Sequence, residues 1–412
     1  MKVEVDNERL SREIEELALI SDAEPPAVTR VVFTPTDLKA RAWLIERCER
    51  ADLVVRQDAI GNTFARWAGS EPNAGAIGTG SHIDAIPNAG KYDGVVGVLG
   101  GLEAIRSLQK AGFRPRRSIE LLVFTSEEPT RFGIGCLGSR LLSGTMSAAA
   151  ARELKDKRET ALEDVRRNAG LAGQLEDVKL PEGYYNAFVE LHIEQGPLLE
   201  REKIPLGVVT QIAAPASYRI SIEGAAGHAG GTLMPGRKDA LCAAAELILA
   251  IETAARTSGA VDTVATVGIC EVFPGAVNSI PSRANLTLDI RDTSLERRDA
   301  AMRVIEMARQ SIVEKRKVGV QMEQLNADAP AQCDPAVVEA LSQACRKQQK
   351  EFMEMVSRAY HDSLFMSRIT PVAMLFIPCR NGYSHRPDEY ASKEDIVRGV
   401  SVLAETLANL AG

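Results

Sequence analysis

Hydrophobic residues in the first half of the chain alternate between helical spacing and short unbroken runs. Apolar positions recur at helical spacing in 10–19 and again in 94–112, which predicts helices with one apolar side. Three apolar runs of strand length accompany them: 75–82, 119–125 and 187–193. Helices that alternate with buried strands indicate an α/β sheet. In such sheets, binding sites form just beyond the carboxyl ends of the strands.

The pattern changes near residue 212. Residues 217–223 alternate between apolar and polar, as expected for an antiparallel strand with one exposed face. Two helices and three further strands are predicted after it: 238–255, 263–272, 284–291, 295–315 and 319–325. This order of elements predicts a ferredoxin-like α+β unit. After Pro330 the pattern returns to helix, strand and helix. We therefore predict a first domain that is split around an insertion.

The predicted fold is α/β, with a mixed sheet flanked by helices in residues 1–211 and 330–412. The inserted α+β domain covers residues 212–329. A chain of 412 residues exceeds what one hydrophobic core usually supports, which favours two domains.

Composition narrows the class of protein. A net charge of −7 argues against a nucleic-acid partner, which would need a basic face. No apolar run approaches the length of a membrane span, and the N-terminus lacks the apolar stretch of a signal peptide. The seven cysteines are dispersed, odd in number and without a Cys-x-x-Cys pair, so reduced thiols are expected. We expect a soluble, cytoplasmic protein.

All five histidines lie in short motifs rich in glycine or acidic residues, a context typical of metal sites. The candidate ligands, in chain order, are His82, Asp93, Glu128, His192 and His385. Imidazoles with carboxylates suit zinc, manganese or cobalt rather than calcium. Five such ligands with one shared carboxylate can hold two ions about 3.5–4 Å apart. The competing interpretation is that these histidines are structural or merely exposed.

Several neighbours of these ligands are candidates for other roles. Asp84 follows His82 by two residues at a strand end, where it can orient the imidazole ring. Glu127 adjoins Glu128, and only one of the two can comfortably face the same metal. The other is free to take a proton from water at the site, which makes Glu127 a candidate general base.

Residues 133–138 match the G-x-G-x-x-G pattern, but they do not directly follow a strand, so a dinucleotide site is not expected. Cys136, inside this segment, could suggest a nucleophile. No separate catalytic histidine is left once the metals are supplied, which argues against thiol catalysis.

Four runs together resemble the amidase/hydantoinase/carbamoylase family, which is related to aminoacylases and di-zinc carboxypeptidases. They are Gly80-Ser81-His82-Ile83-Asp84, Asn88-Ala89-Gly90-Lys91-Tyr92-Asp93-Gly94, Glu127-Glu128-Pro129-Thr130-Arg131-Phe132 and His192-Ile193-Glu194-Gln195-Gly196. Later motifs around His228, Asn278, Arg291, His361 and His385 continue the resemblance in order, so that it covers nearly the whole chain.

The resemblance implies a di-metal, peptidase-like catalytic domain with an inserted lid that also forms a homodimer. It implies two divalent ions per subunit, Mn²⁺ or Zn²⁺ with Mn²⁺ favoured. Asp93 would bridge them, His82 and His192 would lie on opposite metals, and Glu128 and His385 would complete the set.

The resemblance also assigns substrate-binding residues. His228 would polarise the scissile carbonyl, and Asn278 and Arg291 would bind the substrate, one or more of them from the partner subunit. Gln195 would contact the substrate from the catalytic domain. A guanidinium fork is also the natural partner of a substrate carboxylate, although Arg291 could instead pair with Asp289 or Asp292.

One segment departs from the common family pattern. Carbamoylases usually carry Ser-Gly-Ala-Gly-His-Asp-Ala, whereas residues 357–363 read Ser-Arg-Ala-Tyr-His-Asp-Ser, which is more similar to ureidoglycolate amidohydrolases. Tyr360 and His361 would border the substrate, although His361 and Asp362 could also be a packed polar pair. The expected reaction is hydrolysis of the ureido C–N bond of a small carboxylate-bearing ureide, ureidoglycolate or allantoate, as in purine catabolism.

Three alternatives remain open. The nearest is an N-carbamoyl-L-amino-acid hydrolase, and an N-acyl-amino-acid deacylase or dipeptidase with the same metals is further away. A different class of protein would be a catalytically idle paralogue that binds metal or ligand.

Overall fold

The computed structural model describes residues 3–412, which form two compact units. The first unit contains the chain up to Thr210 together with 332–357 and 361–412, and the second contains 211–331 and 358–360. The sequence places residues 358–360 in the first domain, whereas the structure groups them with the second unit. Two contacts explain this: Arg358 donates to Asp262 at 2.6 Å, and the Arg291 guanidinium lies 5.5 Å from the centre of the Tyr360 ring.

A nine-stranded mixed sheet forms the first unit, in agreement with the predicted α/β class. Its path runs β15-β8-β17-β7-β4-β6-β3-β2, and β16 pairs with β8. The strands are β2 (Val54–Gln57), β3 (Thr63–Trp67), β4 (Ala76–His82), β6 (Ile119–Phe124), β7 (Tyr185–Ile193), β8 (Gly207–Ile212), β15 (Ala331–Gln332), β16 (Met353–Ser357) and β17 (Val372–Ile377). The four central strands β17, β7, β4 and β6 are parallel, so their carboxyl ends lie at one edge of the sheet.

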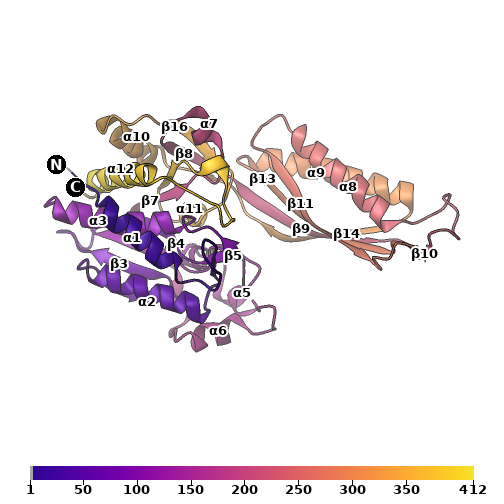
Figure 1. Cartoon of the computed structure of the whole chain (residues 1–412), viewed down its shortest axis with the longest axis horizontal. Helices are drawn as coiled ribbons and strands as arrows, with labels where there is room; N and C mark the ends of the chain where they lie inside the picture. The colour runs from indigo at the N-terminus through magenta and orange to yellow at the C-terminus, as the bar shows by residue number, and fades with distance from the viewer. Residues whose placement is uncertain (1–2) are drawn as a thin grey trace. The chain divides into compact units, whose positions relative to one another are not determined.

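Helices cover this sheet. The larger ones are α1 (Asn7–Ala18), α2 (Pro35–Glu49), α3 (Val95–Lys110), α10 (Pro335–Lys347) and α12 (Lys393–Ala411). Helices α3 and α12 pack on each other and on β4 and β7, while α10 packs on α12 and β17. Figure 1 shows α12 and α3 close to the two chain ends of this unit. Helix α3 is buried along most of its length, as its unbroken apolar pattern requires.

The remaining elements of the first unit are short. They are β1 (Val28–Arg30), β5 (Ala85–Ala89), α4 (Leu137–Ser143), α5 (Ala148–Arg152), α6 (Leu162–Asn168), η1 (Leu175–Val178), α7 (Leu198–Glu202), α11 (Asp362–Met366) and η2 (Arg380–Gly382). Helix α4 contacts α11, and α11 contacts β7 and β17. Among the described residues, no helix is long and apolar enough to cross a membrane.

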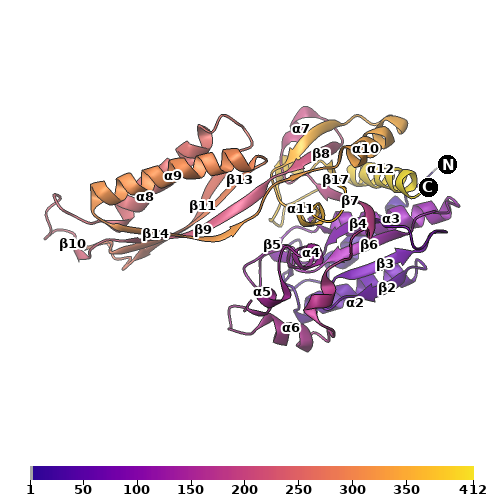
Figure 2. The same cartoon turned by 180° about the vertical axis from the view of Figure 1, so that it is seen from behind.

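The second unit is a four-stranded antiparallel sheet with two helices, in agreement with the predicted ferredoxin-like order. Its strands lie in the order β11-β13-β9-β14: β11 (Val264–Phe273), β13 (Arg283–Asp292), β9 (Ala214–Glu223) and β14 (Gly319–Ala327). Helices α8 (Ala240–Arg256) and α9 (Leu295–Arg316) pack on each other and on the sheet. Figures 1 and 2 show both helices on the same face of this sheet. A small ribbon of β10 (Gly227–His228) and β12 (Ser279–Ile280) completes the unit.

Candidate metal centre

Five predicted ligands meet at the carboxyl edge of the parallel strands in the first unit. His82 ends β4, His192 is the last but one residue of β7, and Glu128 lies in the loop that follows β6. Asp93 immediately precedes the Gly94 cap of α3, and His385 follows η2. All are buried except His385, whose side chain is 47% exposed.

The five side chains form two donor clusters that share Asp93. Oδ1 of Asp93 lies 3.2 Å from Nε2 of His192 and 3.6 Å from Nε2 of His82. Its Oδ2 lies 3.2 Å from Nε2 of His385, which is also 3.3 Å from Oε1 of Glu128. Within each cluster, the three donor atoms lie within 4.8 Å of one another. One carboxylate with an oxygen turned to each cluster is the arrangement that a bridging ligand needs.

The assignment of His82 and His192 to opposite metals is wrong. Both imidazoles face the same oxygen of Asp93 and belong to one cluster, while Glu128 and His385 form the other. The cause is the strand order: β4 and β7 are parallel neighbours whose register pairs Thr79 with Val189. The two histidines, each three residues further on, therefore lie level with each other, and their rings stack with centres 6.2 Å apart.

Backbone carbonyls fix both buried imidazoles for ligation through Nε2. Nδ1 of His82 lies 2.9 Å from the carbonyl oxygen of Asp84, and Nδ1 of His192 lies 2.9 Å from that of Ile193. Each Nδ1 therefore carries the proton and donates it, which leaves the lone pair of Nε2 directed into the cluster. The N–H of Gly94 donates to Nε2 of His192 at 3.1 Å, which agrees with that tautomer.

Glycine is required at position 94. Its φ is +66°, and a Cβ there would lie 2.5 Å from atoms of the His82 ring. Only a residue without a side chain lets the start of α3, and with it Asp93, approach this imidazole so closely.

The close packing of these charged groups shifts their pKa values. Burial and the Asp93 carboxylate raise the pKa of Glu128 to about 7. Burial also opposes the charge on Asp93, but the three imidazoles around its carboxylate outweigh burial and hold the pKa of Asp93 well below its usual value. The hydrogen bond to Asp93 raises the pKa of His385 to about 9. Buried carboxylates packed this closely need positive charge between them.

The donor set fits divalent transition ions. It consists of imidazole nitrogen and carboxylate oxygen, and none of the three candidate clusters found among residues 3–412 contains a cysteine. Such ligands suit manganese, zinc or cobalt. His82, Asp93 and His192 would hold one ion, and Asp93, Glu128 and His385 the other.

Asp84 positions the two glutamates rather than the imidazole alone. Its carboxylate accepts from the backbone N–H of Glu127 at 3.3 Å and of Glu128 at 3.1 Å. The predicted contact with His82 is made mainly by its carbonyl oxygen, since the carboxylate lies 3.8 Å from Nδ1. Asp84 therefore links the end of β4 to the loop after β6.

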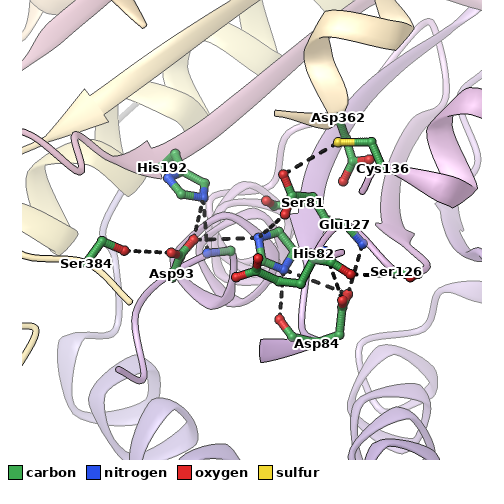
Figure 3. A network of polar contacts seen from close by, with 12 residues as sticks. Ser81, His82, Asp84, Asp93, Ser126, Glu127, Cys136, His192, Asp362 and Ser384 are labelled. Atoms are coloured by element: carbon green, nitrogen blue, oxygen red, sulfur yellow. Dashed lines mark hydrogen bonds and ion pairs between the residues drawn. The ribbon is translucent and has the colours of Figure 1, made fainter. Parts of the chain in front are cut away.

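Glu127 lies beside the clusters without joining either of them. Its side chain is buried, with Oε2 3.8 Å from Nε2 of His82. Its other oxygen faces the thiol of Cys136 (Figure 3). Burial, together with repulsion from Glu128 and Asp362, raises the pKa of Glu127 well above its usual value against the attraction of His82. A buried carboxylate with a raised pKa, close to the ligands but outside both clusters, has the properties of a general base.

Two residues that the sequence analysis missed support Asp93. Oγ of Ser384 lies 2.7 Å from Oδ2 of Asp93 and 2.9 Å from Oε2 of Glu389. Oε1 of Glu389 accepts from the backbone N–H of Tyr92 and Asp93. Burial raises the pKa of Glu389 to about 7. The signal that could have found them is their position, since Ser384 adjoins His385 and Glu389 follows it by four residues.

Gln195 and His361, both predicted to contact the substrate, contact the clusters. Nε2 of Gln195 donates to Oδ2 of Asp93 at 2.7 Å, while its Oε1 is buried without a hydrogen-bond partner in the part of the chain that the structure describes. The His361 ring is buried and packs on His192 with centres 4.5 Å apart, and its Nε2 lies 3.1 Å from Oγ of Ser357.

The remaining predicted residues belong to the second unit and fall into two pairs. His228 on β10 and Asn278 are neighbours, because the Ala229 N–H donates to the Asn278 carbonyl. Arg291, near the end of β13, donates through Nε to Asp289 at 2.7 Å and faces the Tyr360 ring. The pairing of Arg291 with Asp289, named above as the alternative, is therefore present.

These two pairs lie at opposite ends of the second sheet. At the end of β13 next to the β10–β12 ribbon, Arg283 pairs with Glu223 of β9. Near the other end of β13, Arg291 pairs with Pro215. Eight residues of strand separate the two positions, about 27 Å at the usual rise per residue. Figure 1 shows β10 at one end of this sheet.

Known proteins resemble the chain over its full length. The model of peptidase family M20/M25/M40 matches residues 78–409. The ureidoglycolate hydrolases of Oryza sativa subsp. japonica and Arabidopsis thaliana are each 51% identical over 98% of this chain, and over 85% and 87% of their own. A crystal structure of AtUAH in complex with glyoxylate is 50% identical and superposes with a TM-score of 0.91, over 99% of this chain and 98% of its own. An amidase of the hydantoinase/carbamoylase family from Burkholderia multivorans is 33% identical, with a TM-score of 0.90 over 99% and 98%. The chain therefore belongs to peptidase family M20/M25/M40, a metal-dependent family, and within it to the hydantoinase/carbamoylase amidases, which hydrolyse carbon–nitrogen bonds other than peptide bonds.

Proposed function

We propose that the protein hydrolyses the ureido C–N bond of ureidoglycolate. The observation that carries this proposal is the 51% identity to two ureidoglycolate hydrolases along 98% of the chain. AtUAH, 50% identical, is seen with glyoxylate and with (S)-hydroxyglycine. Hydroxyglycine is the amine that remains when ureidoglycolate loses its carbamoyl group, and glyoxylate is what hydroxyglycine becomes when it loses ammonia.

Glu127 moves the proton in this reaction. Its carboxylate takes a proton from water, and the resulting hydroxide attacks the ureido carbonyl. Glu127 then delivers the proton to the nitrogen that departs with hydroxyglycine. The other product is a carbamate, which breaks down to ammonia and carbon dioxide.

His228 is the proposed hydrogen-bond donor to the carbonyl oxygen of the substrate. Its Nδ1 accepts from the backbone N–H groups of Gly230 at 3.2 Å and Gly231 at 3.0 Å. The neutral ring therefore carries its proton on Nε2, which is a donor suited to the negative charge that develops on that oxygen.

Two divalent ions, Mn²⁺ ahead of Zn²⁺, are proposed as the cofactor. When bound, they supply Lewis acidity that makes water easier to deprotonate. The support is the donor set of nitrogen and oxygen with no thiolate. Chelation is expected to abolish turnover and Mn²⁺ to restore it, whereas an idle binding paralogue would show no turnover to restore.

A homodimer is proposed because the second unit of a single chain cannot bring all four of its predicted residues to one small ureide. These residues are His228, Asn278, Arg291 and Tyr360. Arg283, at the end of β13 next to the β10–β12 ribbon that carries His228, lies about 27 Å along the strand from Arg291, far more than the length of such a substrate. Two copies with a twofold axis allow His228 from one chain and Arg291 from the other to serve the same site.

Strand β11 is the proposed interface of that dimer. It is an edge of its sheet, and no other strand among the described residues pairs with its outer side. Ile269 on β11 is 51% exposed, and Leu249 on the adjacent α8 is 62% exposed. A long exposed edge with apolar side chains is a template for pairing with a second copy.

Ammonia release by the Mn²⁺-loaded protein tests the substrate directly. Ureidoglycolate, allantoate and N-carbamoyl-alanine are compared side by side, and ureidoglycolate is expected to have the highest kcat/KM. The second candidate, an N-carbamoyl-L-amino-acid hydrolase, is favoured by relatives such as that of Pseudomonas sp. strain NS671, 36% identical over 98% of both chains. A preference for N-carbamoyl-alanine would overturn the proposal and favour this second candidate. Tyr360→Gly, which introduces the common carbamoylase residue, is expected to raise activity on allantoate, the largest of the three compounds.

A further inference from the structure

A buried thiol lies against the oxygen of Glu127 that faces away from the clusters. Sγ of Cys136 is 3.5 Å from Oε1 of Glu127, a distance typical of an S–H donor. The same two residues share a backbone hydrogen bond, in which the Cys136 N–H donates to the Glu127 carbonyl at 2.8 Å. Figure 3 shows the thiol beside Glu127, with Asp362 next to it. Cys136 therefore contacts Glu127 through both its main chain and its side chain.

This thiol is a donor rather than a nucleophile. Cys136 is completely buried. Burial and the Glu127 carboxylate raise the pKa of Cys136 well above its usual value, so the sulfur keeps its proton. None of the described histidines contacts it in a hydrogen bond, and its one side-chain partner is Glu127.

The backbone at Cys136 favours a residue without a side chain. Its φ of 56° and ψ of 35° lie in the left-handed region, which residues with a Cβ rarely adopt. Glycine occupies three nearby positions of the same segment, 133, 135 and 138, but not this one. At this position the side chain makes a contact that glycine cannot make.

We propose that Cys136 is a positioning residue for Glu127. Its S–H group holds Oε1, and this fixes the carboxylate with Oε2 on the His82 side, where the proton is taken up. The inference rests on the proposed role of Glu127 as general base. In the absence of the thiol, Oε1 would lose the side-chain donor that contacts it. The carboxylate would then rotate among orientations of which only some are productive.

Three substitutions of Cys136 distinguish a hydrogen-bond donor from a residue that only fills space. Cys136→Ala and Cys136→Gly remove the donor, and Cys136→Ser keeps one on the same carbon. The glycine variant also relieves the left-handed backbone, which offsets part of the cost of the lost side chain. Cys48→Ala is the matched control, because Cys48 is equally buried but lies in α2.

Kinetics are measured at equal metal content, with whichever of the three ureides the wild-type protein hydrolyses fastest. We expect kcat to fall about tenfold in the alanine and glycine variants, with KM within twofold, and to recover in part in the serine variant. The control should keep its kcat, and Cys136→Gly should be at least as thermally stable as Cys136→Ala.

Two results would overturn the proposal. One is an unchanged kcat in the alanine and glycine variants, and the other is a serine variant as slow as alanine, which would assign the effect to packing. The choice of substrate keeps this inference separate from the proposed function. If the preferred substrate is not ureidoglycolate, that assignment fails while the comparison of the Cys136 variants still stands.

Discussion

The residues predicted to act on the substrate differ sharply between the two units. In the first unit all but Gln195 and His385 are buried, and Asp93 alone contacts three imidazoles, Gln195 and Ser384. In the second unit His228 and Asn278 are exposed at one end of the sheet, while Arg291 lies at the other. The first group is held in place by contacts within its own unit, whereas the second is divided between two ends of one sheet.

This difference follows from what each group is expected to bind, metal ions in the first unit and the substrate in the second. Carboxylates and imidazoles that bind a metal must be held within about 0.5 Å of the working geometry, so they need fixed neighbours. Groups that bind a substrate must be reachable from solvent. Changes in the first unit are therefore expected to alter kcat, whereas changes in the second are expected to alter KM or to be rescued by a second chain.

The largest effect is expected for Glu127→Gln. Glutamine keeps the shape of the side chain but cannot accept the proton, so we expect kcat to fall by about 10³-fold, within the range for loss of a general base. Bound metal, measured by elemental analysis, should be unchanged because Glu127 belongs to neither cluster. Substantial turnover in this variant would contradict the assignment.

A mixed dimer tests whether one site uses both chains. Glu127→Gln and His228→Ala are each expected to be nearly inactive alone. If His228 serves the partner's site, a dimer with one chain of each kind has one intact site. It should then show about half of the wild-type activity, because the other site carries both changes.

Two differently tagged chains, co-expressed and purified through both tags, supply that dimer. The control pairs Glu127→Gln with Glu128→Gln, two changes in the first unit that cannot complement each other. Activity no higher than that control would place His228 in the site of its own chain.

Arg291→Ala is expected to act mainly on KM. Loss of a charged hydrogen bond to the substrate carboxylate should raise KM by about 10- to 100-fold and change kcat less. Asp289→Asn is the matched control, since it disturbs the ion pair with Arg291 but leaves the guanidinium in place. Equal effects of the two substitutions on KM would assign Arg291 to the ion pair rather than to the substrate.

The parts of the fold that the sequence predicted are those that a local pattern encodes. Apolar runs marked the central strands, and alternation marked the antiparallel strands of the second unit, so both sheets were predicted. The order of strands within a sheet has no local pattern. That is why His82 and His192 were assigned to opposite metals although β4 and β7 are neighbours.

Supporting residues were missed for a related reason. Ser384 and Glu389 reach Asp93 from a loop nearly three hundred residues away in sequence, and serine and glutamate are common everywhere. The contact between Cys136 and Glu127 depends on a left-handed turn that residue types do not reveal. The ligands were predictable because histidine is rare in this chain. The residues that position them are of common types, so the sequence did not reveal them.

Two carboxylates, one from each unit, have pKa values that are shifted in opposite directions. Asp58, in the first unit, is half-buried, and desolvation raises its pKa to about 6. Glu246, on α8 of the second unit, accepts from Arg316 and Lys315, and these hydrogen bonds lower its pKa to about 2. A raised pKa means that the folded protein prefers the protonated acid. The stability contributed by Asp58 is therefore full below pH 4 and is lost as the pH rises through 6.

The smallest predicted effect follows from that loss. Asp58→Asn does not titrate, so its free energy of unfolding relative to the wild type should rise by about 1 kcal/mol between pH 5 and pH 8, after allowance for partial exposure. Urea denaturation followed by tryptophan fluorescence measures it, because both tryptophans, Trp43 and Trp67, belong to the first unit. Glu246→Gln should show no such change, since Glu246 titrates below this range. A pH-independent difference for Asp58→Asn would mean that its carboxylate ionises as freely as the exposed acids of the second unit.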